Sequence, residues 1–140
     1  MLVEIYSDGS ATTADKPGGW AYVILVDGVK YKEGSGHLKS ATNNVAELTA
    51  AIEGLKCAAN DSTICGAQSI VLISDSQLVL KYATGEYKCR KFHLVPLYIQ
   101  LRKEYQALKA TTRWVKGHSG EEHNERCDEL AKAARETVPV

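Results

Sequence analysis

Asp27 and Gly28 lie between two strand-forming runs, and this arrangement constrains the fold more than any other feature of the chain. Trp20–Val26 is a continuous apolar run, and Val29–Gly36 follows with alternating polarity. An Asp-Gly pair between such runs predicts a two-residue hairpin, because glycine tolerates the positive φ that these turns require. Leu2–Ser7 is a third apolar, β-prone run. We therefore expect an antiparallel three-stranded meander at the start of the chain.

The remainder of the chain alternates between helical and strand patterns. Apolar residues at helical spacing from Val45 to Leu55 predict a helix that begins at the capping residues Thr42–Asn44. Two further strands are predicted at Ser69–Ser74 and Thr111–Lys116. Three further helices are predicted at Ser76–Tyr82, His93–Leu108 and Glu121–Arg135. Since strand–helix–strand crossovers join parallel strands, we expect an α/β fold with a five-stranded mixed sheet, three antiparallel strands followed by two parallel ones, flanked by helices.

Length and composition predict a small protein of one domain. The chain has 140 residues, so we expect a single domain over residues 1–140. It starts at Met1 and ends with Pro139 and Val140 after the last predicted helix, which favours a whole small protein over a domain of a longer one. The chain has neither a signal peptide nor an apolar run of membrane-spanning length. We expect a cytoplasmic monomer with no obligate protein partner.

The four cysteines do not have the spacing of a metal site. We expect free thiols, with a Cys57–Cys65 bridge as the alternative; the other two cysteines are Cys89 and Cys127. Charge is unevenly distributed although the formal net charge is zero. Residues 81–116 contain nine Lys/Arg and two Asp/Glu, whereas residues 1–80 contain five and nine. This asymmetry favours a phosphate-contacting face beside an acidic one, and ordinary solvated helix faces are the alternative.

Four acidic residues stand where an α/β sheet places its active site. Asp8 and Asp75 follow predicted strands, Glu47 lies near the start of the first helix, and Asp128 lies in the last helix. Converging carboxylates repel one another unless a cation neutralises them, and Mg²⁺ prefers such oxygen ligands. Each residue also has a structural interpretation: Asp8 as a turn former, Glu47 as part of a capping box with Asn44, Asp75 as a helix cap, and Asp128 as part of a solvated acidic face.

A histidine between glycines completes the candidate site. His118 lies in the stretch Lys116–Gly120, where flanking glycines predict a mobile loop. A histidine in such a loop can transfer a proton near neutral pH. The alternative is an exposed loop histidine without a role.

Five segments together resemble the type 1 ribonuclease H family, in order and in spacing, over nearly the whole chain. They are Ser7–Ser10, Thr42–Leu48, Ser74–Gln77, Trp114–Gly120 and Asn124–Ala131. The resemblance implies a ribonuclease H-like fold and a metal-dependent endonuclease that hydrolyses the RNA strand of RNA–DNA hybrids. It implies products with 5′-phosphate and 3′-hydroxyl ends.

The same resemblance implies roles for individual residues. Asp8, Glu47, Asp75 and Asp128 would hold two Mg²⁺ or Mn²⁺ ions, and His118 would assist proton transfer or product release. Contacts with the hybrid are implied for Thr42, near a DNA-strand phosphate, and for Asn43, Asn44 and Gln77 near the cut. Side-chain amides suit a 2′-hydroxyl, which both donates and accepts hydrogen bonds.

The sequence departs from the best-known bacterial pattern of this family in two places. The stretch Thr84–His93 is much shorter than the basic protrusion found there. We expect Lys88, Arg90 and Lys91, with Lys81, to replace part of it in binding phosphates. In that family pattern, the loop corresponding to Ala11–Gly19 often carries an asparagine that contacts substrate. This sequence has no asparagine there.

Three alternatives remain at this point. One is a different nuclease of the same superfamily that acts on DNA, and the specific histidine loop and the short chain argue against it. Another is a non-catalytic hybrid-binding domain, which the retention of all four carboxylates argues against. The third is a domain of a reverse transcriptase.

Overall fold

The chain forms one five-stranded sheet with helices on both faces. The computed structural model describes residues 1–137, so Pro139 and Val140 lie outside the described residues. The strands are β1 (Leu2–Ala11), β2 (Gly18–Val26), β3 (Val29–Leu38), β4 (Ser69–Ser74) and β5 (Thr111–Trp114). The helices are α1 (Asn43–Ala59), α2 (Gln77–Thr84), the short 3₁₀ helix η1 (Phe92–Leu94), α3 (Val95–Ala107) and α4 (Glu122–Glu136).

The sheet has the predicted mixture of antiparallel and parallel pairing. Its strand order is β3-β2-β1-β4-β5. β1 and β2, and β2 and β3, pair antiparallel, whereas β1 and β4, and β4 and β5, pair parallel. β1 is therefore central, with an antiparallel neighbour on one side and a parallel one on the other. The predicted fold class is confirmed.

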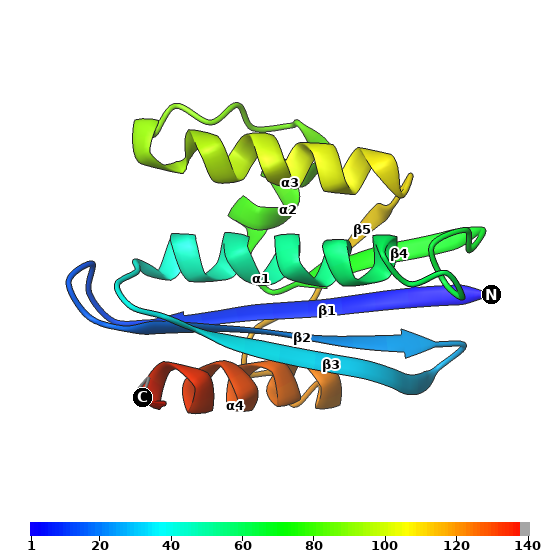
Figure 1. The fold of residues 1–140 in the computed structure, drawn as a ribbon, viewed down its shortest axis with the longest axis horizontal. Helices are drawn as coiled ribbons and strands as arrows, with labels where there is room; N and C mark the ends of the chain where they lie inside the picture. Colours follow the sequence, from blue (N-terminus) through cyan, green and yellow to red (C-terminus); the bar gives the residue numbers. More distant parts are fainter. Residues whose placement is uncertain (138–140) are drawn as a thin grey trace.

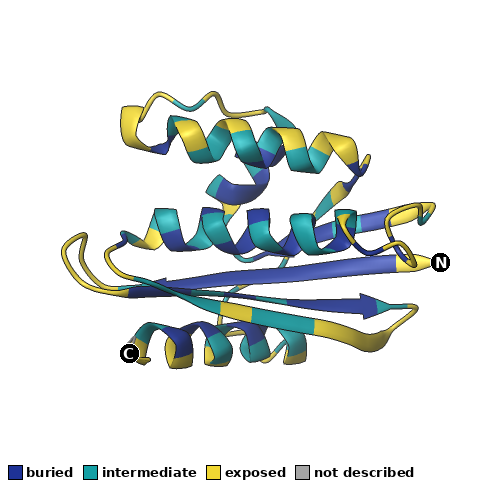
Figure 2. Cartoon of the chain, in the orientation of Figure 1, coloured by how far each residue is buried: buried dark blue, intermediate teal, exposed yellow. Residues whose placement is uncertain are grey.

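The helices are divided unequally between the two faces of the sheet. Figure 1 shows α1 across one face, with α2 and α3 beyond it, and α4 alone across the other face. β1 is buried along most of its length between these layers, as Figure 2 shows. Gly54 of α1 lies directly on the sheet, since a Cβ there would come 2.8 Å from a methyl group of Ile5. The small side chains of α1 allow this close approach.

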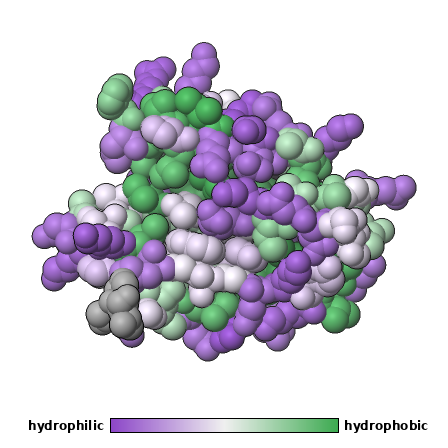
Figure 3. Space-filling model, in the orientation of Figure 1, coloured by the Kyte–Doolittle hydropathy of each residue, from purple (hydrophilic) through white to green (hydrophobic). Residues whose placement is uncertain are grey.

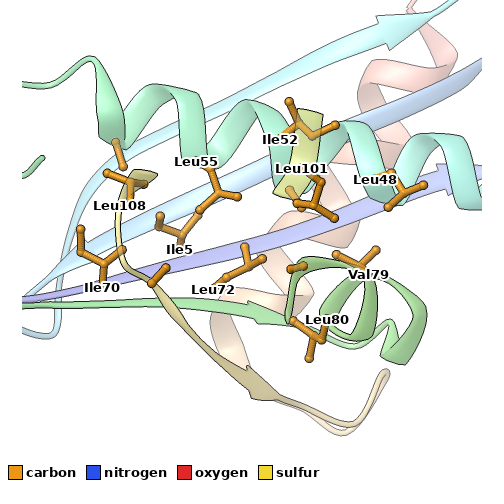
Figure 4. Packing of buried hydrophobic residues seen from close by; sticks show 14 of the residues in the cluster. Ile5, Leu48, Ile52, Leu55, Ile70, Leu72, Val79, Leu80, Leu101 and Leu108 are labelled. Atoms are coloured by element: carbon orange, nitrogen blue, oxygen red, sulfur yellow. The ribbon is translucent and has the colours of Figure 1, made fainter. Parts of the chain in front are cut away.

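The main core lies between the sheet and the layer of α1, α2 and α3. Ile5, Leu48, Leu55, Leu72 and Leu101 are all fully buried in it (Figure 4). Each buried aliphatic side chain of this size contributes about 1.5–3 kcal/mol of transfer free energy. The α4 face has a smaller cluster around Tyr6, Val23, Leu25, Ile73 and Cys127. The thicker core therefore holds α1, which carries Glu47.

Several predicted boundaries were wrong because strand pairing, not composition, sets where a strand ends. β1 continues to Ala11, because β2 pairs with it as far as Ala11 and Gly18. Asp8 is therefore inside β1 and not at its end. β5 stops at Trp114, because its partner β4 ends at Ser74. The loop between β1 and β2 is accordingly shorter than predicted, and β3 reaches Leu38.

The helix caps exclude two structural interpretations of the acidic residues. The Thr42 hydroxyl accepts from the backbone N–H of Val45 and caps α1, so Asn44 and Glu47 form no capping box. The Ser76 hydroxyl accepts from the N–H of Val79 and caps α2, so Asp75 is not the cap. Capping was correctly predicted at Thr42, and Asp75 and Glu47 are left free for another role.

The four cysteines are free thiols, as predicted, and no Cys57–Cys65 bridge forms. Within residues 1–137, no helix has the length and apolar character needed to cross a bilayer.

Figure 3 shows a surface rich in hydrophilic side chains, with apolar atoms gathered over the layer of α2 and α3. Phe92, at the start of η1, is 92% exposed and is the most exposed of the large apolar side chains there.

Candidate active site

Strand register brings Asp8 and Asp75 side by side. The parallel ladder between β1 and β4 pairs Tyr6 with Ile73 as its last pair. Asp8 lies two residues further along β1, and Asp75 lies two residues after Ile73, directly after the end of β4. Because side chains alternate between faces with a period of two, equal offsets place both carboxylates at the same level of the sheet. The parallel pairing of β1 with β4 therefore brings the carboxylates of Asp8 and Asp75 together.

Close packing of α1 on β1 adds Glu47. A Cβ at Gly9 would come 2.3 Å from the backbone nitrogen of Glu47, so only glycine allows α1 to approach this closely. Glu47 lies in the second turn of α1 and points back towards the sheet edge where Asp8 and Asp75 lie. Carboxylate oxygens of the three residues lie within 4.8 Å of one another. Packing of α1 on β1 and pairing of β1 with β4 thus bring together residues that are up to 67 positions apart in the sequence.

Burial and mutual repulsion act together on these carboxylates. The pKa of Asp8 is raised to about 8, first by burial and then by the charges of Asp75, Asp128 and Glu47. The pKa values of Glu47 and Asp75 are also raised, in each case mainly by burial. Burial penalises a charged group, and a like charge penalises it further. The cluster is consequently a place where a bound cation would relieve a large electrostatic cost.

Asp128 lies beside the cluster but belongs to a second group. One ligand atom from each of Asp128, His118 and Glu125 lies within 4.8 Å of the other two. The charge of Asp128 still raises the pKa values of Asp8 and Asp75, so the two groups are adjacent. Lys132 Nζ lies 3.0 Å from an Asp128 carboxylate oxygen. Three of the four predicted carboxylates therefore converge directly, and the fourth adjoins them together with His118.

His118 has a backbone conformation that loop residues seldom adopt. It is exposed, and its φ of 54° places it in the left-handed region. Such a conformation costs a non-glycine residue on the order of 1 kcal/mol and is concentrated at functional sites. The His118 charge also lowers the pKa of Asp75, so the ring is near that carboxylate.

The donor set fits a hard divalent cation. Asp8, Glu47 and Asp75 offer only carboxylate oxygens, which Mg²⁺ and Mn²⁺ prefer. The side chains of Glu47, Asp75 and Asp128 are partly open to solvent. A partly open site can keep water molecules and admit an anionic substrate group.

Comparison with known proteins assigns this arrangement to a family. A family model for RNase H matches residues 2–136. The chain belongs to the ribonuclease H family. A ribonuclease H from Pseudomonas entomophila (strain L48) is 35% identical over 147 aligned positions, which cover 97% of this chain and 95% of that protein. The chain is accordingly a ribonuclease H enzyme.

Two solved structures show the same fold. RNase H1 from the halophilic archaeon Halobacterium salinarum NRC-1 matches with a TM-score of 0.81 and 31% identity, covering 96% of this chain and 97% of that one. LC11-RNase H1, in complex with an RNA/DNA hybrid, matches with a TM-score of 0.83 and 25% identity, covering 95% and 96%. The expected ribonuclease H-like fold is confirmed.

In this ribonuclease H, the residues predicted to contact substrate surround the carboxylates. Asn43 is exposed, and its amide donates a 2.7 Å hydrogen bond to the Glu47 carboxylate. Asn44 follows it on the first turn of α1, beside the cap Thr42. Gln77 is exposed at the first position of α2, two residues after Asp75. These side chains thus lie at the two helix starts nearest the cluster.

The predicted basic residues lie further from the cluster. Lys88, Arg90 and Lys91 are exposed in the segment between α2 and η1. Among residues 1–137, none of these three takes part in an ion pair, whereas Lys81 is paired with Glu86 at 2.8 Å. The eight residues of α2 separate the segment from Asp75 by about 12 Å, at 1.5 Å per helical residue.

Two residues of this ribonuclease H site were not assigned a role from the sequence. Ser76 hydrogen-bonds the Glu47 carboxylate while it caps α2. Asn124, buried in the first turn of α4, hydrogen-bonds the Asp75 carboxylate. Both lie in the segments that carry the family resemblance, and only the folded geometry indicates which carboxylate each one contacts.

Proposed function

We propose that this enzyme hydrolyses the RNA strand of RNA–DNA hybrids at a site formed by Asp8, Glu47, Asp75 and Asp128. The observation that carries the proposal is the convergence of Asp8, Glu47 and Asp75 within 4.8 Å. Structural similarity to LC11-RNase H1, whose structure contains an RNA/DNA hybrid, supports the substrate class. We propose one domain that works as a cytoplasmic monomer.

The proposal includes two divalent ions. Asp8, Glu47 and Asp75 would hold one, and Asp128 with Asp8 would hold the second, because Asp128 is near enough for its charge to raise the pKa of Asp8. Two Mg²⁺ or Mn²⁺ ions bound there would activate a water molecule and stabilise the leaving oxygen of a phosphodiester. Attack of that water on phosphorus would break the bond to the 3′-oxygen, which takes up a proton, and would leave 5′-phosphate and 3′-hydroxyl ends.

The protein's own side chains orient the carboxylates and handle the proton. Asn43 and Ser76 each hydrogen-bond Glu47, which limits rotation of its carboxylate. His118, exposed beside Asp75 and Asp128, can receive a proton or deliver one to the leaving oxygen.

Recognition of the hybrid would depend on groups that contact 2′-hydroxyls and phosphates. The amides of Asn43, Asn44 and Gln77 can pair with a 2′-hydroxyl, which only RNA carries. Thr42 would approach a phosphate of the DNA strand at the start of α1. Contacts of this kind carry little base information, so weak sequence preference is expected.

Lys88, Arg90 and Lys91 would contact phosphates about 12 Å from the cut, which is the length of α2. Neutralising all three should weaken hybrid binding and reduce its dependence on salt concentration, because each lost phosphate contact removes a released counterion. An unchanged salt dependence would exclude this part of the proposal. Lys39, exposed directly after β3 and in no ion pair among residues 1–137, provides a control for the loss of one charge.

The function is tested with end-labelled RNA presented as an RNA–DNA hybrid, as a single strand and as duplex RNA, and with an end-labelled DNA duplex. Each substrate is incubated with Mg²⁺, Mn²⁺ or EDTA, beside the variant Glu47→Gln. We expect cutting of the hybrid alone, a requirement for metal, loss of cutting in the variant, and product ends that a ligase accepts without prior phosphorylation.

Two outcomes would contradict the proposal. Hybrid binding without cutting under either metal would favour a non-catalytic hybrid-binding protein. Cutting of DNA duplexes in preference to hybrids would favour another nuclease of the same superfamily.

A further inference from the structure

Trp114 is hydrogen-bonded to the backbone of a predicted metal ligand. It is the last residue of β5 and is 48% exposed, so burial does not explain its position. Its indole N–H donates to the backbone carbonyl oxygen of Asp75 at 3.1 Å. The next residue, Val115, donates its backbone N–H to the carbonyl of Ser74 at 3.1 Å. Trp114 and Val115 therefore hold the backbone carbonyls on both sides of the Asp75 Cα.

Gly117 packs against the carboxylate of the same residue. A Cβ at Gly117 would come 2.9 Å from Asp75 Oδ2, and the two next nearest atoms, both at 3.5 Å, also belong to Asp75. Gly117 does not have a positive φ. The backbone at this position would accept alanine without strain, so the only conflict would be with Asp75. The absence of a side chain at residue 117 has a local reason, which is the space that the Asp75 carboxylate occupies.

The same segment continues directly into His118. Gly117 precedes that residue, and Asn124 hydrogen-bonds the Asp75 carboxylate from α4. Asp75 is thus held at its carbonyl by Trp114, confined at its carboxylate by Gly117 and hydrogen-bonded by Asn124. One short segment fixes a carboxylate of the cluster and positions the exposed histidine beside it.

We propose that Trp114 and Gly117 are positioning residues that set the geometry of Asp75 as a metal ligand. The inference rests on the proposed role of Asp75 in metal binding. Partners that orient a ligand commonly change metal affinity 10–100-fold when they are removed. The segment Trp114–Gly117 is therefore part of the metal site although it contributes no ligand atom.

The first test is the variant Gly117→Ala, with Gly66→Ala as its control. A Cβ at Gly66 meets no atom within 4 Å, and that glycine also does not have a positive φ. Binding of Mg²⁺ is measured by calorimetry in the absence of substrate, and thermal unfolding is followed in EDTA. We expect Gly117→Ala to bind Mg²⁺ about tenfold more weakly, with a Tm equal to that of Gly66→Ala.

The second test uses the two tryptophans of the chain. Trp20→Phe leaves Trp114 as the only indole, and Trp114→Phe keeps an aromatic ring but removes the N–H donor. We expect the emission of Trp114 to change as Mg²⁺ is added to Trp20→Phe, and the midpoint of this change to move about tenfold higher when Gly117→Ala is added. Trp114→Phe should bind Mg²⁺ more weakly than Trp20→Phe does.

The results separate this inference from the proposed function. Wild-type Mg²⁺ affinity in both Gly117→Ala and Trp114→Phe would overturn the inference, even if the enzyme cuts hybrids. Weaker binding accompanied by a matching fall in Tm would also overturn it, because that result indicates packing alone. An enzyme that binds Mg²⁺ as expected but cuts no hybrid would overturn the proposed function and leave the inference standing.

Discussion

Asp8 and Asp61 are two carboxylates with nearly equal burial and opposite electrostatics. Asp8 is 6% exposed and Asp61 is 9% exposed. The pKa of Asp8 is raised to about 8, whereas that of Asp61 is lowered to about 2. They lie near opposite ends of α1, whose 17 residues span about 25 Å.

Burial is the largest cause of the pKa shift at Asp8, and the partners of each carboxylate decide whether that cost is offset. Asp61 is paired with Lys32 Nζ at 2.7 Å and accepts hydrogen bonds from the Tyr31 hydroxyl and the Thr63 backbone N–H, each at 2.9 Å. Asp8 accepts from the N–H of Gly9 at 2.9 Å and otherwise faces other carboxylates. Burial raises the pKa of both carboxylates, but only at Asp61 do cationic and hydrogen-bond partners outweigh it. Asp61 stabilises the fold through its donors, whereas Asp8 carries a cost that a cation would remove.

The largest effect expected from this contrast is on catalysis. Asp8→Asn should lower the rate of hybrid cleavage by at least about 10³-fold, since the bound metal supplies several kcal/mol of transition-state stabilisation. Asp61→Asn should leave the rate within about threefold of wild type at a temperature where both are folded. Single-turnover cleavage at saturating Mg²⁺ measures both rates. Comparable losses in the two variants would remove the distinction between the two carboxylates.

The next effect is expected from the loss of proton transfer, with metal binding unchanged. His118→Asn should lower the cleavage rate by about 10²-fold, because it removes a proton carrier. Asparagine is the better substitution here, since it tolerates the left-handed backbone that His118 adopts. Mg²⁺ affinity and Tm should stay at wild-type values. A wild-type rate would mean that the carboxylates suffice and that His118 is an ordinary loop residue.

Much of the fold could be predicted because its signals are local. The Asp27-Gly28 turn, the helical spacing in α1 and the apolar β4 each depend on neighbouring residues, and all three elements formed. Strand ends could not be predicted in the same way, because they depend on a partner strand. β1 extends past Ser7 through pairing with β2, and composition around Ala11 does not show this.

The candidate site likewise combines features that local sequence predicts with features that depend on distant elements. The four carboxylates were predicted to converge, and Asp8, Glu47 and Asp75 do so because β1 and β4 are neighbours in the sheet, although Asp8 lies inside β1. The separate grouping of Asp128 with His118 and Glu125 depends on the position of α4 on the opposite face, which no local pattern encodes. The contacts of Ser76, Asn124 and Trp114 with the cluster likewise arise from elements distant in sequence.

An effect is also expected on stability without metal, and its sign is opposite for the two carboxylates. The folded chain holds a proton on Asp8 that the unfolded chain releases above about pH 4, so the cost of folding rises from pH 4 to about pH 8. Asp8→Asn removes this cost. We expect the variant to be more stable than wild type in EDTA at pH 8, by up to about 5 kcal/mol for a pKa raised from about 4 to about 8, and nearly equal at pH 4.

Urea unfolding in EDTA measures this difference, and saturating Mg²⁺ should reduce or reverse it, because the metal binds the folded wild type. A variant that is less stable than wild type in EDTA at pH 8 would contradict the idea that Asp8 strains the metal-free fold.

The smallest effect is expected for Asp61. Its ionised form is favoured in the folded chain, so its contribution to stability is present above about pH 4 and is lost as the pH falls towards about 2. Asp61→Asn should therefore be less stable than wild type at pH 7, with a difference that closes at acidic pH. The effect should stay below that of Asp8, because the Lys32 side chain is 47% exposed and solvent screens the pair.

Asp15→Asn, in the exposed loop between β1 and β2, is the control and should show no difference from wild type that closes at acidic pH. If the Asp61→Asn difference is unchanged between pH 7 and pH 2.5, the carboxylate stabilises the fold through its shape and hydrogen bonds and not through its charge.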